Sequence, residues 1–180
     1  MLKKLAIAAA VLIVLVAGVV VYAAATQPDE FRVSRTASIR APAERIHALV
    51  NEPRRHREWS PFEAKDPSMK RTYTGASAGK GAAYEWDGNS EIGAGRMAVA
   101  ESSPQRIVMD MHFLRPFESR STAEFAFQPS GETTEVTWSI YGPAQLITKV
   151  MGLFFSMDAM IGREFESGLA KLKSVTEASS

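Results

Sequence analysis

The most constraining feature of this chain is a series of short strand-like segments that ends in one long amphipathic helix. Six such segments lie between residues 69 and 141, separated by turn sequences such as Asp87-Gly88-Asn89-Ser90. Connections this short imply an antiparallel meander. From residue 157 to Val175 the apolar side chains recur at helical spacing, and Ser156 is placed to cap that helix. One sheet and one helix can bury both apolar faces only if the sheet curls around the helix. Gly168 predicts a close contact between the two.

A strand, a helix and a tryptophan motif precede the meander. Residues 33–40 alternate with period two and Ala41-Pro42 ends them, which predicts a half-buried strand. A short amphipathic helix carries Ile46, Leu49 and Val50 on one face, a proline break follows, and Trp59-Ser60-Pro61-Phe62 closes the unit. This order resembles the beginning of START-like (SRPBCC) superfamily chains. The ending Phe165-Glu166-Ser167-Gly168-Leu169-Ala170-Lys171-Leu172-Lys173 resembles their polyketide cyclase/dehydrase-like branch.

The resemblance implies an α+β helix-grip fold over residues 32–176. We expect a curved antiparallel sheet of about seven strands wrapped around a long C-terminal helix, preceded by one transmembrane helix. Members of the superfamily include lipid carriers, cyclases and co-chaperones, so the resemblance leaves the activity open.

The first 26 residues differ in character from the rest. Residues 5–25 carry no charge, and a helix of that length spans about 30 Å, the hydrocarbon thickness of a bilayer. Ala23-Ala24-Ala25 would suit a signal peptidase, but the apolar run exceeds the length of a signal core, which favours a retained anchor. Lys3 and Lys4 would stay in the cytoplasm. We therefore expect a single-pass protein of the bacterial inner membrane with its folded domain on the periplasmic side, a linker at 27–31 and a tail at 177–180.

Composition excludes several classes of function. The chain has no cysteine, so it has no disulfide, thiolate metal site or cysteine nucleophile. Of 21 basic residues, Lys3 and Lys4 precede the domain, so 19 remain against 20 acidic residues, which argues against nucleic acid as a partner. The three histidines share no ligand spacing, and we expect no metal. The Gly75–Gly81 and Gly93–Gly95 patterns lack the spacing or the following helix of a nucleotide site, so we expect no cofactor.

The candidate binding residues are apolar side chains on the inward-facing positions of the strands and helices. Each one on its own is better explained as core, but together they suit an adaptable lining for an irregular apolar ligand. The residues 144–155 would form a lid. The predicted lining consists of Tyr84, Trp86, Met97, Met109, Met111, Phe113, Phe125, Phe127, Trp138, Phe154, Met157, Met160, Ile161 and Phe165.

The sequence favours binding of a hydrophobic small molecule or lipid over catalysis. Glu85, Asp87, Asp110 and His112 alternate with the apolar set and are expected to face solvent, so no inward acid or base is predicted. There are two alternatives. One is a cyclase, dehydratase or hydrolase that uses the same cavity, and the other is a co-chaperone-like interaction module with a filled interior. The oligomeric state does not follow from the sequence.

Overall fold

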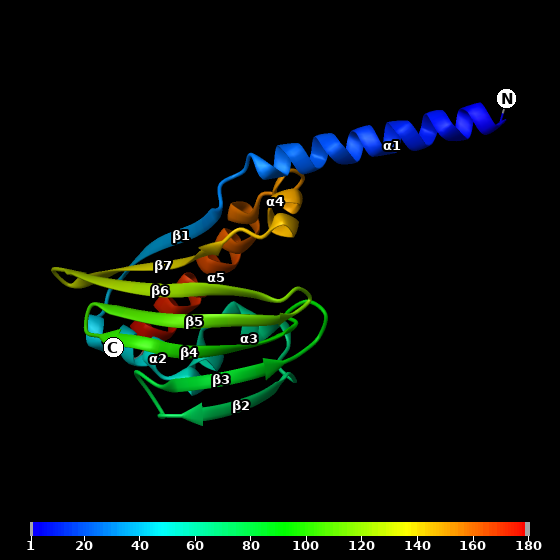
Figure 1. The fold of residues 1–180 in the computed structure, drawn as a ribbon. Coiled ribbons are helices and arrows are strands. Elements are labelled where there is room, and N and C mark those ends of the chain that lie inside the picture. The colour runs from blue at the N-terminus through cyan, green and yellow to red at the C-terminus, as the bar shows by residue number, and fades with distance from the viewer. Residues whose placement is uncertain (1, 179–180) are drawn as a thin grey trace.

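A seven-stranded antiparallel sheet curves around one long helix in the computed structural model, which describes residues 2–178 (Figure 1). The strands are β1 (Glu30–Ile39), β2 (Lys70–Gly75), β3 (Ala82–Asp87), β4 (Ala94–Ser103), β5 (Arg106–Arg115), β6 (Ser119–Ser130) and β7 (Thr133–Pro143). The helices are α1 (Leu2–Ala25), α2 (Ala43–Asn51), the 3-10 helix η1 (Pro53–Glu58), α3 (Pro61–Lys65), α4 (Leu146–Gly152) and α5 (Met157–Ala178).

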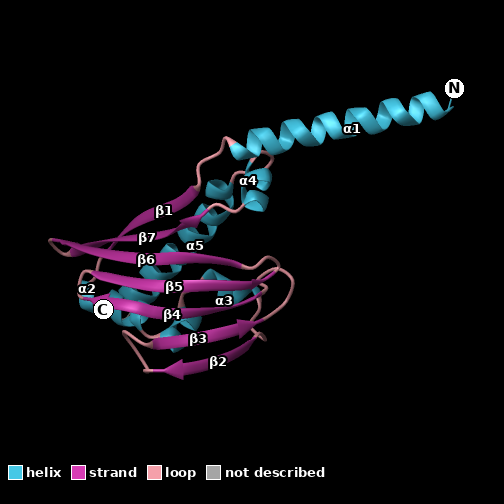
Figure 2. Ribbon diagram, viewed as in Figure 1, coloured by secondary structure: helices cyan, strands magenta, loops and turns pink. Residues whose placement is uncertain are grey.

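The strand order is β1-β7-β6-β5-β4-β3-β2, so strands β2 to β7 form a continuous meander and β1 adds to its β7 edge. In the β1–β7 pair, Ala37 lies opposite Val136. Helices α2, α3 and α5 all lie against one face of the sheet (Figure 2). The predicted antiparallel helix-grip arrangement of about seven strands is confirmed.

Helix α5 follows the predicted pattern from its first residue. The Ser156 hydroxyl accepts a hydrogen bond from the Ala159 backbone N–H at 3.1 Å, which caps the helix. Phe165, Leu169 and Leu172 are buried against the sheet. A side-chain carbon at Gly168 would lie 2.7 Å from the Trp138 ring, so the predicted close contact between helix and sheet is confirmed.

Strand β1 is tied to α5 by charge. Arg35 points toward the helix and forms ion pairs with Asp158 at 2.9 Å and with Glu166 at 2.6 Å. A side-chain carbon at Gly162 would collide with the Arg35 guanidinium, so the glycine makes room for the arginine to reach both carboxylates.

The tryptophan motif anchors the α2–α3 region. The Trp59 indole N–H donates to the Leu49 carbonyl at 3.1 Å, and the buried His56 ring donates from Nε2 to the Val50 carbonyl at 2.7 Å. These bonds use carbonyls at the end of α2 that have no partner within the helix. The segment after α2 is thereby fixed beneath the sheet.

Helix α1 projects away from the folded domain (Figure 1). Ala24, near its end, is fully buried, and α1 contacts α4 there. Over the residues described, none of the helices is both long enough and apolar enough to cross a membrane. At the other end of the chain, Glu177 accepts a hydrogen bond from the Arg40 N–H at 2.7 Å, while residues 179–180 of the expected tail lie outside the described residues.

Candidate functional site

An apolar cavity of about 320 Å³ lies between the inner face of the sheet and the N-terminal half of α5. This volume falls at the lower end of the range for small-molecule sites. Strands β3, β5, β6 and β7 supply one wall, and α3, α5 and three loops supply the rest. The lining consists of Phe62, Met69, Tyr84, Trp86, Glu91, Ile92, Met111, Phe113, Arg115, Pro116, Ala123, Trp138, Ile140, Ile161 and Phe165.

Aromatic rings fix the walls. The rings of Trp138 and Phe165 stack with centroids 3.9 Å apart, which joins β7 to α5 at one side of the cavity. Trp86 meets Phe113 edge to face at 5.8 Å between centroids. A side-chain carbon at Gly95 would lie 2.5 Å from the Trp86 ring, so this glycine lets the indole lie across β4.

The exposed members of the lining mark the mouth. Glu91 and Arg115 are the charged residues there, and each has a partner: Glu91 pairs with Lys65 at 2.9 Å, and Arg115 pairs with Asp87. Lys65 also pairs with Glu164 of α5 at 2.8 Å, so one lysine connects α3, α5 and the loop after β3. These ion pairs hold the rim of the cavity together.

The mouth continues into a second groove of about 200 Å³ beneath α4. Phe113, Arg115 and Pro116 line both spaces. Phe117, Ile147 and Met151 are among the residues that complete the groove on the α4 side. The cavity therefore opens toward α4, the helix that contacts α1.

The interior of the cavity carries little polar chemistry. Trp86 donates its indole N–H to the Ile92 carbonyl at 3.3 Å. Tyr84 is buried, and burial raises the pKa of its phenol, so the hydroxyl stays neutral. Within the described residues this hydroxyl forms no hydrogen bond. A neutral phenol is a poor base.

One buried ion pair lies close by but does not line the cavity. Glu63 of α3 and Arg71 of β2 are 2.6 Å apart with both side chains buried, and Arg71 also donates to the Met69 carbonyl at 2.7 Å. Among the described residues, Glu63 Oε1 is the buried side-chain oxygen without a hydrogen-bond partner. The arginine neutralises the carboxylate, and the pair fastens α3 to the edge of the sheet.

The structure brings half of the predicted lining residues to the cavity. The members of the predicted set that line it are Tyr84, Trp86, Met111, Phe113, Trp138, Ile161 and Phe165. Whether they bind a ligand stays a prediction.

The other predicted residues lie elsewhere. Four of them, Met97, Met109, Phe125 and Phe127, are buried in the hydrophobic core. Phe154 and Met160 are exposed by 67% and 50%, and Met157 is half-buried outside the lining. The 144–155 segment, expected as a lid, lies beside the mouth with most of its apolar side chains exposed.

Several lining residues were not among the predicted set. Phe62 and Met69 come from α3 and the segment after it, and Ile92 comes from the loop after β3. The Trp59-Ser60-Pro61-Phe62 motif carried a signal for Phe62, because it places that ring directly after the helix break. Ile92 and Pro116 lie in loops, where no periodicity indicates which way a side chain points.

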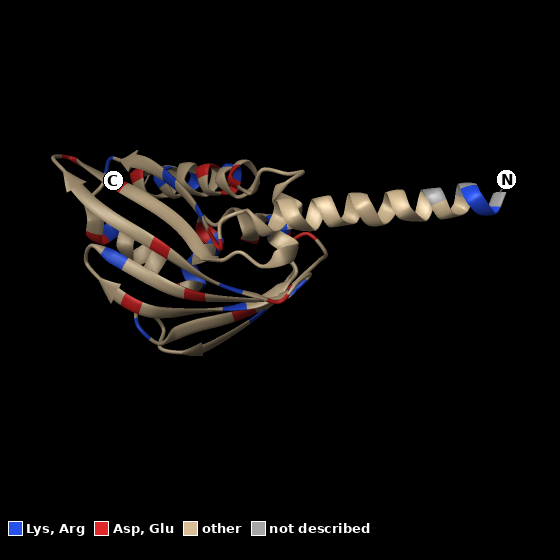
Figure 3. Ribbon diagram, turned by 45° about the horizontal axis from the view of Figure 1, so that its top comes forward, with Lys and Arg blue, Asp and Glu red and all other residues tan. Residues whose placement is uncertain are grey.

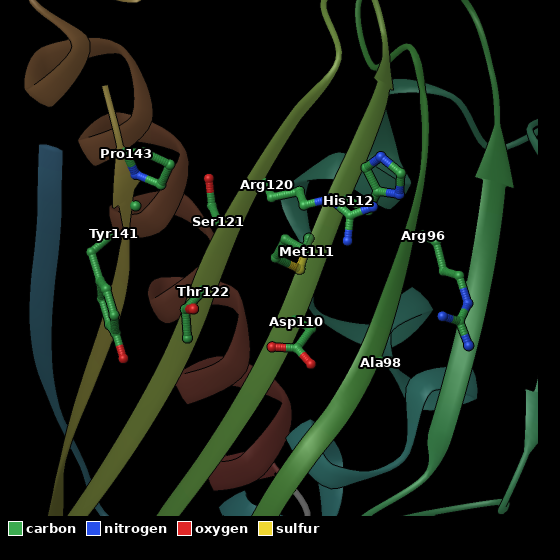
Figure 4. Close-up of a pocket in the computed structure, with 11 residues that line it drawn as sticks. Arg96, Ala98, Asp110, Met111, His112, Arg120, Ser121, Thr122, Tyr141 and Pro143 are labelled. Atoms are coloured by element: carbon green, nitrogen blue, oxygen red, sulfur yellow. The ribbon is translucent and has the colours of Figure 1, made fainter. Parts of the chain in front are cut away.

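A polar groove of about 460 Å³ occupies the opposite face of the sheet (Figure 4). Its charged side chains are Arg96, Asp110, His112 and Arg120. Basic and acidic residues alternate across this face (Figure 3), and His112 is paired with Glu118 at 3.0 Å. Asp110, Glu85 and Asp87 are exposed here as predicted. Mixed charge gives the groove no preference for an anionic or a cationic ligand.

Residues 30–177 match the family model described as "Polyketide cyclase / dehydrase and lipid transport". No curated protein matches the chain significantly. Solved structures show the same fold at low identity. A protein of unknown function from Staphylococcus aureus is 14% identical with a TM-score of 0.61, and the alignment covers 84% of this chain and 97% of that one.

Two further solved structures are similar to this chain. A protein from Chromobacterium violaceum is 15% identical with a TM-score of 0.57, covering 83% of this chain and 99% of that one. A START superfamily protein from Mycobacterium smegmatis is 16% identical with a TM-score of 0.51, and the coverage is again 83% and 99%.

Proposed function

Because the chain belongs to the polyketide cyclase/dehydrase and lipid transport family, we propose that it binds a hydrophobic small molecule or lipid between its sheet and helix α5. The observation that carries this proposal is the apolar cavity of about 320 Å³ with a defined mouth. Its lining combines rigid aromatic rings with methionine, which adapts to irregular ligands. Tyr84, a residue of the lining, carries a neutral hydroxyl.

The lining supports binding over catalysis. General acid–base chemistry needs a titratable group within hydrogen-bonding reach of the substrate. The carboxylate in the lining, Glu91, lies at the exposed rim and is paired with Lys65. Glu63 is buried outside the lining and is neutralised by Arg71. The cavity is therefore better suited to binding a molecule than to acid–base catalysis.

The proposal includes a membrane tether formed by residues 5–25. This tether is an inference from the sequence, in which 21 uncharged residues follow Lys3 and Lys4. The side chains from Val11 to Val16 are all more than half exposed in the described chain. An exposed apolar surface of this kind marks a site of contact with a membrane or with another protein. In a bacterial cell this arrangement corresponds to a single-pass inner-membrane protein with its domain in the periplasm. A tether suits the function because an apolar ligand is most abundant in the bilayer.

A matched pair of substitutions on β6 tests the binding role. Ala123 lines the cavity, and Ala126 lies three residues away on the polar face of the same strand. We expect Ala123→Leu to fill the cavity and remove saturable binding of a fluorescent fatty-acid probe by the full chain in detergent. Ala126→Leu is expected to leave binding unchanged. Equal binding by both variants and the wild type would contradict the proposed site.

A further inference from the structure

A group of exposed apolar side chains surrounds α4, on the side of the domain from which α1 leaves. Phe154 is 67% exposed, Phe155 60%, Leu146 55% and Phe117 53%. Together with Ile147 and Met151 of α4 they form what we call the α4 surface. Single exposed apolar residues are ordinary, but a cluster of this kind marks a contact site.

The α4 surface is ordered by its own backbone. The N–H groups of Phe154 and Phe155 donate to the Met151 carbonyl at 3.0 and 2.9 Å, so the two rings follow the last turn of the helix. Phe117, from the loop after β5, lies on the same groove as Ile147 and Met151. The rings are thus presented outward by a folded segment.

The position of the α4 surface is fixed relative to the end of α1. Lys149 donates to the Asp29 carboxylate at 2.6 Å and to the Gln27 carbonyl at 3.2 Å, and the Ala144 N–H donates to the Asp29 carbonyl at 2.7 Å. Figure 1 shows α4 beside the base of α1. Whatever holds α1 therefore also approaches the α4 surface.

The charge of this region identifies the kind of partner. Between Gly142 and Asp158 the single charged residue is Lys149, whose side chain is only 10% exposed because it is bonded to Asp29. Arg115, which lines the groove, and Asp29 are both exposed, but each is already paired, Arg115 with Asp87 and Asp29 with Lys149. Phenylalanine, leucine, isoleucine and methionine without charge suit the boundary between headgroups and acyl chains.

We propose that the α4 surface inserts into the interfacial region of a lipid bilayer, with Phe154 and Phe155 reaching the acyl chains. This inference rests on the proposed tether, because α1 supplies the continuity that selects a bilayer over a second protein. The groove beneath α4 shares Phe113, Arg115 and Pro116 with the cavity mouth. Contact with the bilayer would therefore give an apolar ligand a route to the cavity that does not cross water.

Nitroxide labels on single cysteines test this inference, and the absence of native cysteine makes the labelling specific. The full chain is reconstituted in phosphatidylcholine vesicles with Phe155→Cys, with Glu132→Cys in the β6–β7 turn as control, and with Val14→Cys in α1. Accessibility to oxygen and to a water-soluble nickel chelate is then measured. We expect the label at 155 to be reached by oxygen and shielded from nickel, and the label at 132 to be open to nickel.

The three labels separate the possible failures. A label at 155 as open to nickel as that at 132, while the label at 14 is in lipid, would overturn the α4 contact and leave the tether intact. Nickel access at 14 would overturn the tether and this inference with it. Spin–spin broadening at 155 that disappears on dilution with unlabelled protein would show that a second copy covers the surface, which also overturns it. Binding by the cavity is measured separately with the fatty-acid probe.

Discussion

The indole of Trp138 on β7 lies flat on the ring of Phe165 on α5, with ring centroids 3.9 Å apart and an interplanar angle of 9°. This stack is the closest aromatic pair between sheet and helix among those in the described chain. It separates the interior into two parts. On one side the core is closely packed around Phe125 and Trp59. Their ring centroids lie 4.9 Å and 5.5 Å, respectively, from that of Trp138. On the other side the cavity remains open.

Gly168 is predicted to be essential for this packing. A leucine there would clash with Trp138 and with Pro61 of α3, whose Cδ lies 2.9 Å from the position of the added carbon. We expect Gly168→Leu to lower the free energy of unfolding by about 3 kcal/mol, as measured by urea denaturation. The control is Gly152→Leu, where an added carbon meets nothing within 4 Å, and its stability should stay within about 0.5 kcal/mol of wild type. Equal stability of the two variants would show that α5 is not seated on Trp138.

Met111 is predicted to contact the ligand. Its side chain lines the cavity from β5, whereas its neighbour His112 lies on the polar face of the same strand. We expect Met111→Arg to abolish uptake of an apolar fluorescent dye, because a charge in an apolar lining disfavours an apolar ligand. His112→Arg should leave uptake intact. Undiminished uptake by Met111→Arg would remove this strand from the lining.

Acid is predicted to destabilise the domain through His56. Burial lowers the pKa of this ring to about 4, from an ordinary value near 6.5, although its hydrogen bond to the Val50 carbonyl acts in the opposite direction. The unfolded chain takes up the proton first as the pH falls. The stabilisation from neutral His56 is therefore complete above pH 6.5 and is lost between pH 6.5 and 4, by about 3 kcal/mol.

Urea denaturation at a series of pH values checks this prediction. His56→Gln keeps an amide N–H for the Val50 carbonyl but does not titrate. The variant should show a shallower loss of stability between pH 6.5 and 4 than the wild type. Parallel curves for the two proteins would assign the acid sensitivity to other groups.

Arg35 and Gly162 are predicted to act as a unit. In the wild type, an alanine at residue 162 would displace the Arg35 guanidinium from its two carboxylates. In an Arg35→Ala background the same substitution meets no guanidinium and should stabilise α5 by about 1 kcal/mol through helix propensity. A double-mutant cycle of unfolding free energies measures the coupling. Identical effects of Gly162→Ala in both backgrounds would contradict the contact.

The domain is predicted to fold without the first 26 residues. Within the described part of α1, Ala24 is the buried hydrophobic residue, so little of the core depends on this helix. A chain that begins at residue 27 should be monodisperse in aqueous buffer. Its far-ultraviolet circular dichroism should match that of the full chain after the helical signal of α1 is subtracted. Aggregation of this shortened chain would mean that α1 belongs to the folded domain.

Periodicity was sufficient to predict the strands and helix α5, because one buried face imposes a repeat of two or 3.6 residues on the sequence. It also placed Met111 and Trp86 on the inward face of the sheet, and His112 and Asp87 on the outward face. Periodicity does not indicate where an interior is empty. Met97 and Met111 share the inward face, and yet Met97 is buried in the core whereas Met111 borders the cavity.

The open space depends on residue sizes and on contacts between distant segments. Ala123 contributes to the cavity partly because its side chain is small, and Phe62 and Ile92 enter from loops that no repeat describes. Phe154 and Met160 were expected inside because of their apolar character and spacing, but they are exposed. The ion pairs of Arg35 and Lys149 join α5 to β1 and α4 to the segment before β1. Those pairs join residues more than 100 positions apart, which a local pattern does not reveal.

Native mass spectrometry of the full chain, released from membranes under mild conditions, tests the central claim most directly. We predict an additional mass on the wild type that fragmentation identifies as an apolar or lipid molecule. The same mass should be present on Ala126→Leu and absent from Ala123→Leu. A bare protein mass for all three, or an adduct retained equally by Ala123→Leu, would contradict ligand binding in the cavity beneath α5.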